Sequence, residues 1–168
     1  MDRQRTEFER LALPHLDAAY TLARWLSRST VDAEDIVQEA MLRAYRAFDS
    51  VRGESVRPWL MSIVRNCFRD HLARAGRLEG LGDRLDHAPF EGPSPEAEAA
   101  VASDRRRLDA MLALLPDDFR EVLVLREVED MSYREIAEAI GAPIGTVMSR
   151  LARARALLKD TWLAEDRR

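Results

Sequence analysis

The sequence holds a single cysteine, Cys67, among its 168 residues. One cysteine cannot form an intrachain disulfide, and it excludes a zinc site built mainly from thiolates. Cys67 stands in an apolar run that also contains Ile63, Val64 and Phe68. These surroundings predict a buried thiol rather than a nucleophile.

Signatures of catalysis and of metal binding are scarce as well. The three histidines, His15, His71 and His87, are scattered over three segments, so their spacing supplies no convergent set of metal ligands. The sequence shows neither a Gly-rich phosphate-binding loop nor paired catalytic residues. An enzyme interpretation therefore has no positive support, and we expect no metal and no cofactor.

Long apolar runs are also missing, and none approaches the length of a transmembrane helix. The N-terminus is charged rather than signal-like. The cytoplasm is therefore the expected compartment, without membrane insertion. A hydrophobic content of 46% is nevertheless enough for packed cores.

Alternation of polar and apolar residues with a period of two is absent, whereas helical spacing recurs. Pro14 lies inside the first periodic segment, residues 7–28, and predicts a kink or a later helix start. A second helix is expected over residues 32–48, and a third over about 58–74 with Leu72 on its apolar face. These patterns predict an all-α fold.

Helical spacing returns near Ala97, after a stretch rich in glycine and proline. Pro116 ends an apolar face that includes Leu108, and Asp117 and Asp118 begin another helix. We therefore expect two small helical domains joined by a flexible linker. The expected bounds are residues 1–75, 76–103 and 104–168.

The charge distribution supports the same division. The net charge of −4 is unusual for a protein that binds DNA, but residues 78–104 alone hold seven acids against one base. Basic residues concentrate instead in residues 65–77 and near the C-terminal end. Because salt screens charges beyond about 10 Å, local potential matters more than the total. The pattern indicates two basic patches separated by an acidic linker.

The segment 132–159, SYREIAEAIGAPIGTVMSRLARARALLK, carries the strongest local signal and reads as a helix-turn-helix. Ser132 and Glu135 form a capping box, and Gly141 suits a turn with an unusual backbone conformation. The second helix has a basic outer face, which suits the DNA major groove. An ordinary helical hairpin with a solvated basic face is the alternative. The outer face comprises Ser149, Arg150, Arg153 and Arg155.

A second motif group lies in DAEDIVQEAMLRAYRAFDSVRGESVRPWLMSIVRNCFRDHLAR. Here an acidic amphipathic helix leads through a short loop into a helix that bears several arginines. On composition alone, the polar face of the acidic helix is most simply a solvated surface.

Together the two groups resemble a known family. The order of DAEDIVQEAMLRAYRAF, RPWLMSIVRNCFRDHL and LLPDDFREVLVLREVEDMSYREIAEAIGAPIGTVMSRLARAR is similar to that of the extracytoplasmic-function sigma factors of bacterial RNA polymerase. The resemblance covers nearly the whole chain except the linker and the ends. It implies a first domain that binds the core polymerase and melts the minus-ten promoter element, and a second that reads the minus-thirty-five element.

Residue by residue, the resemblance assigns roles in both domains. The loop 49–56 resembles the segment that captures a flipped base. The residues that resemble the polymerase-contacting surface are Asp35, Gln38, Glu39 and Arg43. In the same domain, Asn66 and Arg69 resemble minus-ten DNA contacts, and Arg65 and Arg74 resemble phosphate contacts. In the second domain Ser149, Arg150 and Arg153 would read bases, and Thr146, Arg155 and Lys159 would hold phosphates.

The implied partners are core RNA polymerase, promoter DNA and an anti-sigma factor, and we expect a monomer when these are absent. Two alternatives remain at this point. A stand-alone helix-turn-helix regulator would dimerise on an operator without polymerase. A sigma-like adaptor would sequester an anti-sigma protein without directing transcription.

Overall fold

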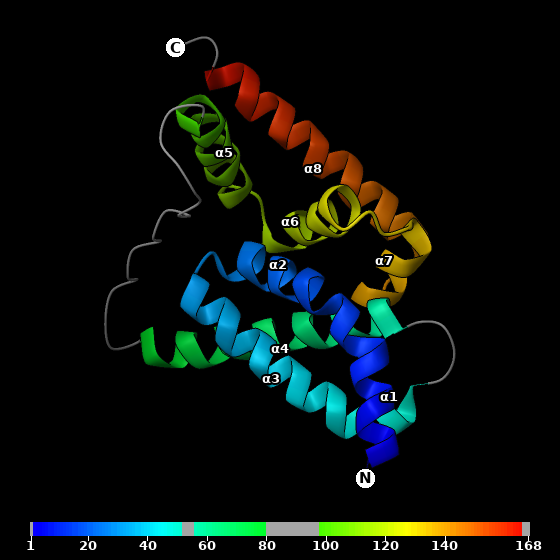
Figure 1. The fold of residues 1–168 in the computed structure, drawn as a ribbon. Coiled ribbons are helices and arrows are strands. Elements are labelled where there is room, and N and C mark those ends of the chain that lie inside the picture. The colour runs from blue at the N-terminus through cyan, green and yellow to red at the C-terminus, as the bar shows by residue number, and fades with distance from the viewer. Residues whose placement is uncertain (1, 52–55, 80–97, 166–168) are drawn as a thin grey trace.

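The computed structural model describes residues 2–51, 56–79 and 98–165, and it contains only helices and turns in these ranges (Figure 1). This confirms the all-α prediction. The central part of the predicted base-capturing loop and most of the predicted linker, residues 52–55 and 80–97, lie outside the described residues. No helix in the described ranges is long and apolar enough to cross a membrane.

Pro14 interrupts the N-terminal helical segment, as its position predicted. Helix α1 spans Asp2–Ala12, a 3-10 turn spans Leu13–His15, and α2 spans Leu16–Ser27. A proline cannot donate the hydrogen bond that a continuous helix needs at this point.

Helix α3 spans Thr30–Ala47 and begins at a side-chain cap. The hydroxyl of Ser29 accepts a hydrogen bond from the backbone N–H of Asp32 at 3.2 Å. Phe8 of α1 makes edge-to-face contacts with Tyr45 and Phe48, each with ring centroids 5.3 Å apart. These contacts fix α1 against the C-terminal end of α3.

Helix α4 spans Val56–Glu79 and packs across α2 and α3 (Figure 1). Its buried stripe runs from Val56 to Phe68. The prediction that Leu72 lies on this apolar face is wrong, because the stripe ends at Phe68 and the following turns lie mostly at the surface. Leu72 is 42% exposed.

The described part of the C-terminal half, residues 98–165, contains four α-helices. Helix α5 spans Glu98–Ala113, α6 spans Asp117–Leu123, α7 spans Tyr133–Ile140 and α8 spans Ile144–Glu165. A short π-helical segment, Val124–Val128, extends α6 and was not foreseen. Leu108, expected on the apolar face of α5, is 42% exposed and therefore does not belong to the core.

The side chain of Arg120, in α6, caps the C-terminal end of α5. Arg120 is 4% exposed, and its guanidinium donates hydrogen bonds to the carbonyl oxygens of Leu112, in the last turn of α5, and of Leu115, in the turn that follows, both at 2.8 Å. The last carbonyls of a helix have no partner within that helix. The buried cation satisfies these groups, and the carboxylate of Asp117, 3.1 Å away, offsets its charge.

The helix-turn-helix has the local geometry that the sequence predicted. Ser132 accepts a hydrogen bond from the backbone N–H of Glu135, and the Glu135 carboxylate accepts one from the backbone N–H of Ser132. Gly141 ends α7 with φ of 65°, in the left-handed region. The core-facing residues of α8, all buried, are Val147, Leu151 and Ala154.

The two halves of the chain pack directly on each other. Helix α2 contacts α6, and α4 contacts α7 (Figure 1). Buried side chains from both halves form one continuous hydrophobic cluster. The helices that carry the predicted sites are therefore held in one compact arrangement.

Candidate functional site

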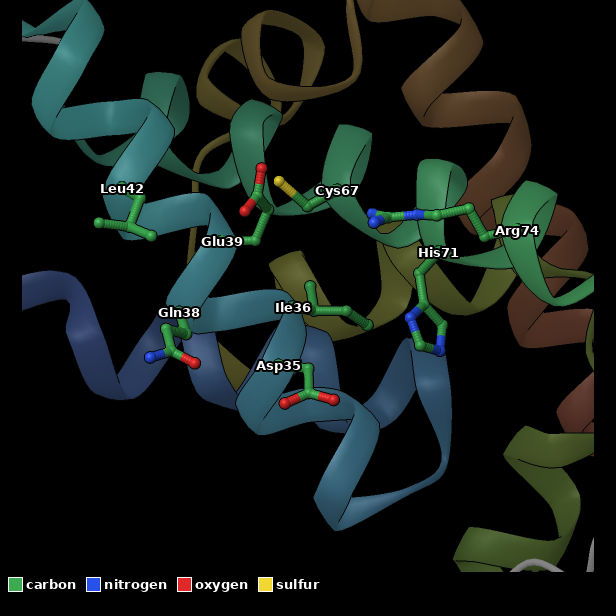
Figure 2. Close-up of a pocket in the computed structure, with 8 residues that line it drawn as sticks. All are labelled: Asp35, Ile36, Gln38, Glu39, Leu42, Cys67, His71 and Arg74. Carbon is green, nitrogen blue, oxygen red and sulfur yellow. The ribbon is translucent and has the colours of Figure 1, made fainter.

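The polar face of α3 borders a hollow of about 300 Å³ between α3 and α4 (Figure 2). Asp35 and Gln38 are exposed, and Glu39 is half-buried. Helix α3 also contributes Leu42, whose side chain is 48% exposed. From α4 the lining residues are Cys67, His71 and Arg74. Three of the four predicted polymerase-contacting residues thus line one hollow.

The fourth predicted residue, Arg43, crosses from α3 to α4. It donates hydrogen bonds to Glu39 at 2.7 Å and to Asp70 of α4 at 2.6 Å. The hydrogen bonds to Asp70 and Glu39 raise the pKa of the Arg43 guanidinium above its ordinary value. The arginine therefore orients Glu39 at the hollow and joins the two helices.

Cys67, the thiol that lines the hollow, is not an activated nucleophile. Burial raises the pKa of the Cys67 thiol, and a protonated thiol is a poor nucleophile. Leu42, Asp35 and Glu39 of α3 line the hollow together with His71 and Arg74 of α4 (Figure 2). The α3 side of the hollow combines an apolar contact with two carboxylates, which suits a partner that presents basic and apolar side chains there, while the α4 side adds His71 and Arg74.

The predicted minus-ten residues of α4 divide into two groups. Asn66 and Arg74 are exposed. Arg65 instead forms an ion pair with Glu121 of α6, in which its side chain is 11% exposed and that of Glu121 is 4% exposed. Arg69 lies 3.6 Å from Asp118, one helical turn earlier on α6. The side of α4 that carries Arg65 and Arg69 therefore faces the C-terminal half.

The predicted residues of α8 also differ in their surroundings. Arg153 and Lys159 are exposed, as is Ser149, whose hydroxyl donates to the Thr146 carbonyl at 3.1 Å. Arg150 is half-buried and lies 3.7 Å from Asp118. The Arg155 guanidinium donates a hydrogen bond to the Glu127 carboxylate at 2.6 Å, and this bond raises the pKa of Arg155.

Acidic residues of α6 meet predicted DNA-binding arginines from both halves, and the sequence did not reveal this. Asp118 lies within 4 Å of Arg69 and Arg150, and Glu121 pairs with Arg65. Burial raises the pKa of Glu121 to about 7, although Arg65 and Arg69 act in the opposite direction. The sequence does show two acids three residues apart, on one face of α6. It does not show which arginines they meet, because those arginines are remote in sequence.

Arg57 makes a second connection between the halves. Its guanidinium donates to both carboxylate oxygens of Glu135, each at 2.8 Å, and to the backbone carbonyl of Glu129 at 3.3 Å. Glu135 is also the capping-box residue of α7. The start of α4 is therefore fixed to the start of the helix-turn-helix by a bidentate ion pair.

Family models match both halves of the chain. The model of sigma-70 region 2 matches residues 11–78, and that of sigma-70 region 4 matches residues 105–158. The first match contains α2, α3 and most of α4, and the second contains the helix-turn-helix.

Full-length relatives show the same similarity. The chain is 37% identical over 158 residues to the ECF RNA polymerase sigma factor SigE of Mycolicibacterium smegmatis. This alignment covers 91% of this chain and 60% of that protein. It is 35% identical over 149 residues to the ECF RNA polymerase sigma-E factor of Haemophilus influenzae, covering 83% and 78% of the two chains. The Escherichia coli sigma-E factor is 37% identical over 134 residues, covering 74% and 70%.

Two solved structures share the fold. The sigma factor RpoE, in complex with the anti-sigma factor NepR from Bartonella quintana, matches with a TM-score of 0.79 and 29% identity, over 92% of this chain and 95% of that one. CnrH, in complex with the cytosolic domain of CnrY, matches with a TM-score of 0.68 and 28% identity, over 95% and 90%. Both matches include the two halves and therefore extend beyond a shared helix-turn-helix.

Proposed function

The chain belongs to the extracytoplasmic-function sigma factors of bacterial RNA polymerase, and from this membership we propose that it binds the core enzyme and directs transcription from its own set of promoters. One observation carries the proposal: a region 2 match and a region 4 match occur in order on a chain that aligns along most of its length with named sigma factors. A stand-alone helix-turn-helix regulator is not favoured, because such a protein has no need of region 2.

The two halves have separate tasks in this proposal. Residues 1–75 bind core polymerase and open the minus-ten element, residues 104–168 read the minus-thirty-five element, and residues 76–103 connect them. The role of the chain is binding and not catalysis. It acts in the cytoplasm, where bacterial RNA polymerase and promoter DNA are found.

Core polymerase binds at the hollow between α3 and α4. The support is geometric: Asp35, Gln38 and Glu39 surround it, and Arg43 orients Glu39. The polymerase surface that fits carries basic side chains around an apolar contact.

Charge reversal tests this surface. Replacing Asp35 and Glu39 by lysine should weaken binding to core polymerase about tenfold or more, because two attractive charges become repulsive. Surface plasmon resonance would measure the affinity, and circular dichroism would check that helicity is retained.

The matched control reverses two exposed carboxylates on α1, Glu7 and Glu9. It changes the net charge equally but lies away from the hollow, so it should leave the affinity near that of the parent chain. Equal losses in both variants would mean that overall charge, and not this surface, governs binding.

Promoter DNA is held by residues of both halves. In α4, Asn66, Arg69 and Arg74 are exposed, whereas Arg65 is held in its ion pair with Glu121. In α8 the base-reading residues are Ser149, Arg150 and Arg153, and the phosphate-binding residues are Thr146, Arg155 and Lys159. Arginine suits both tasks because its guanidinium binds guanine and phosphate bidentately.

An anti-sigma protein is the proposed inhibitor of this chain. Both structural neighbours were solved with a protein partner, in one case a named anti-sigma factor. A partner that contacts both halves gains from the high effective concentration of its second contact. It occludes the hollow at α3 and the 149–155 surface, so adding core enzyme should release it. A transcriptionally active complex of all three proteins would contradict direct occlusion.

A further inference from the structure

The outer face of α8 carries an apolar row to which the proposed function gives no role. Its members, Ile144, Met148 and Ala152, are all exposed, Ile144 by 45% and Met148 by 52%. Residues four apart are neighbours on one face of a helix, so the three side chains form a continuous row. With a rise of about 1.5 Å per residue the row is about 12 Å long, roughly the rise of three to four base-pair steps.

The charge around the row fits a polyanion. Residues 143–159 contain no acidic residue, and Arg153 and Lys159 are exposed on the same helix. The core side of α8 is separate, because Val147 and Leu151 are buried. DNA combines the two properties that this face requires, since its phosphates are anionic and the 5-methyl group of thymine is an apolar group in the major groove.

The row lies in the part of α8 that meets base edges in a helix-turn-helix. The recognition helix of this motif enters the major groove with its N-terminal residues towards the bases. Helix α8 begins at Ile144, so Ile144 and Met148 lie in its first two turns. A Cβ added at the exposed Gly145 would meet no atom within 4 Å, and the backbone of this turn is therefore open to a close approach.

Two of the three residues expected to read bases are already engaged within the chain. The hydroxyl of Ser149 donates its single hydrogen to the Thr146 carbonyl at 3.1 Å. Arg150 is half-buried and lies 3.7 Å from Asp118. Besides the exposed Arg153, the helix thus presents apolar contact as its second means of reading a base.

Resting on the proposed function, we propose that Ile144, Met148 and Ala152 read the 5-methyl groups of thymines in the minus-thirty-five element. Met148 is the main specificity-determining residue of the row. Its side chain is the longest of the three, and its flexible, polarisable thioether adapts to the surface of a methyl group. The row adds a preference for thymine to the base that Arg153 reads.

Deoxyuridine isolates this contact, because it differs from thymidine only in lacking the 5-methyl group. Two duplex libraries with a randomised centre, one containing thymine and one containing uracil in its place, are selected with the chain, both with and without core polymerase. The parent should enrich thymine at about one to three positions of the first library. Replacing one of these thymines by uracil should weaken binding about fourfold, the change expected for losing one buried methyl group.

Variants of Met148 assign the preference to this side chain. Met148→Ala should bring the ratio of thymine to uracil affinity close to one at one of these positions. Met148→Leu keeps an apolar side chain of similar volume and should retain most of the preference. All three residue types favour an exposed helical position, so the helix is retained.

Leu157→Ala is the matched control. Leu157 is also a large apolar residue of α8 and is 41% exposed. It lies nine residues beyond Met148, about two and a half turns, and therefore on the opposite side of the helix. The control should leave the thymine-to-uracil ratio at the parental value.

Equal binding of the thymine and uracil duplexes by the parent would overturn the inference, as would equal changes of the ratio in Met148→Ala and Leu157→Ala. A Met148→Ala chain that loses affinity for core polymerase but keeps the parental ratio would assign the row to a protein contact instead. Selection of no motif in either form of the experiment would also count against it. Transcription with core polymerase is a separate assay. If the parent directs none, the proposed function fails, while the ratio measured without polymerase still decides the inference.

Discussion

At the scale of single residues, two exposed cations of α8, Arg153 and Lys159, are predicted to contact DNA in different ways. Arg153 lies in the middle of the helix and Lys159 near its last turns, and both side chains are exposed. An arginine at a base edge discriminates between sequences, whereas a lysine at a phosphate does not. The two positions should therefore respond differently to truncation.

Arg153→Ala is expected to cost about 1–3 kcal/mol of promoter binding and to relax preference at one or two positions of the minus-thirty-five element. Lys159→Ala should weaken binding to all sequences alike and reduce the salt slope by about one. Selection from a randomised promoter library, performed with the holoenzyme, measures both effects. A uniform loss over the library for Arg153→Ala would show that this residue does not read a base.

Glu121 gives the molecule a pH dependence whose sign follows from its pKa. Burial raises that pKa from the ordinary 4.5 to about 7, although Arg65 and Arg69 of α4 act to lower it and Asp118 of α6 adds to the increase. The folded chain therefore binds this proton more tightly than the unfolded chain. The contribution of Glu121 to stability is present below about pH 4.5 and is lost as the pH rises towards 7.

Glu121→Gln, which imitates the protonated side chain, tests this sign. The variant and the parent should have similar free energies of unfolding at acidic pH, and the variant should become more stable than the parent on the alkaline side, by on the order of 1–3 kcal/mol. Urea unfolding at several pH values measures the difference. A variant that is less stable than the parent at every pH would show that the pair with Arg65 outweighs the burial of the charge.

At the scale of elements, the start and stop signals of the helices were predicted and are confirmed. Pro14 breaks the first helical segment, and the Ser132–Glu135 capping box begins α7. These signals act through the backbone of neighbouring residues, so a sequence contains all the information they need.

Sequence periodicity was less reliable for burial. Leu72 and Leu108 fit helical stripes but are exposed, because a stripe is buried only where another element covers that turn. The π-helical segment Val124–Val128 was also missed, since its sequence VLREV carries no breaker. Helix type and single cap or break signals were therefore predictable, whereas the full extent of each helix was not: α4 spans Val56–Glu79 instead of about 58–74, and α3 begins at Thr30 instead of residue 32.

The turn of the helix-turn-helix allows a matched test of backbone conformation. Gly141 has φ of 65° and Gly145 lies in α8, and a Cβ at either position would have no neighbour within 4 Å. Gly141→Ala should cost about 1–2 kcal/mol of stability, because an L-residue is strained in the left-handed region. Gly145→Ala should be neutral or stabilise by up to about 0.5 kcal/mol. Thermal melting distinguishes them, and equal effects would show that φ at Gly141 does not matter.

At the scale of the whole molecule, the candidate surfaces were predictable but their relation to one another was not. Motif resemblance alone is enough to single out the candidate residues of α3, α4 and α8. The pairing of Arg65 with Glu121, and of Arg57 with Glu135, joins residues far apart in sequence and depends on how the halves pack. Such contacts follow from tertiary structure and leave no local pattern.

The packing of the two halves also bears on the net charge of −4, which is unusual for a protein that binds DNA. The arginines of α4 meet acids of α6, so the charges balance within the chain.

The central claim is tested most directly by transcription with purified core RNA polymerase and mapping of the transcript 5′ ends. The account predicts that adding the chain produces starts that share one pair of upstream elements, with spacing typical of minus-ten and minus-thirty-five sites, and without ATP-dependent melting. Core enzyme alone should not use these starts. A palindromic footprint formed by the chain without polymerase, together with no change in the starts, would contradict the account.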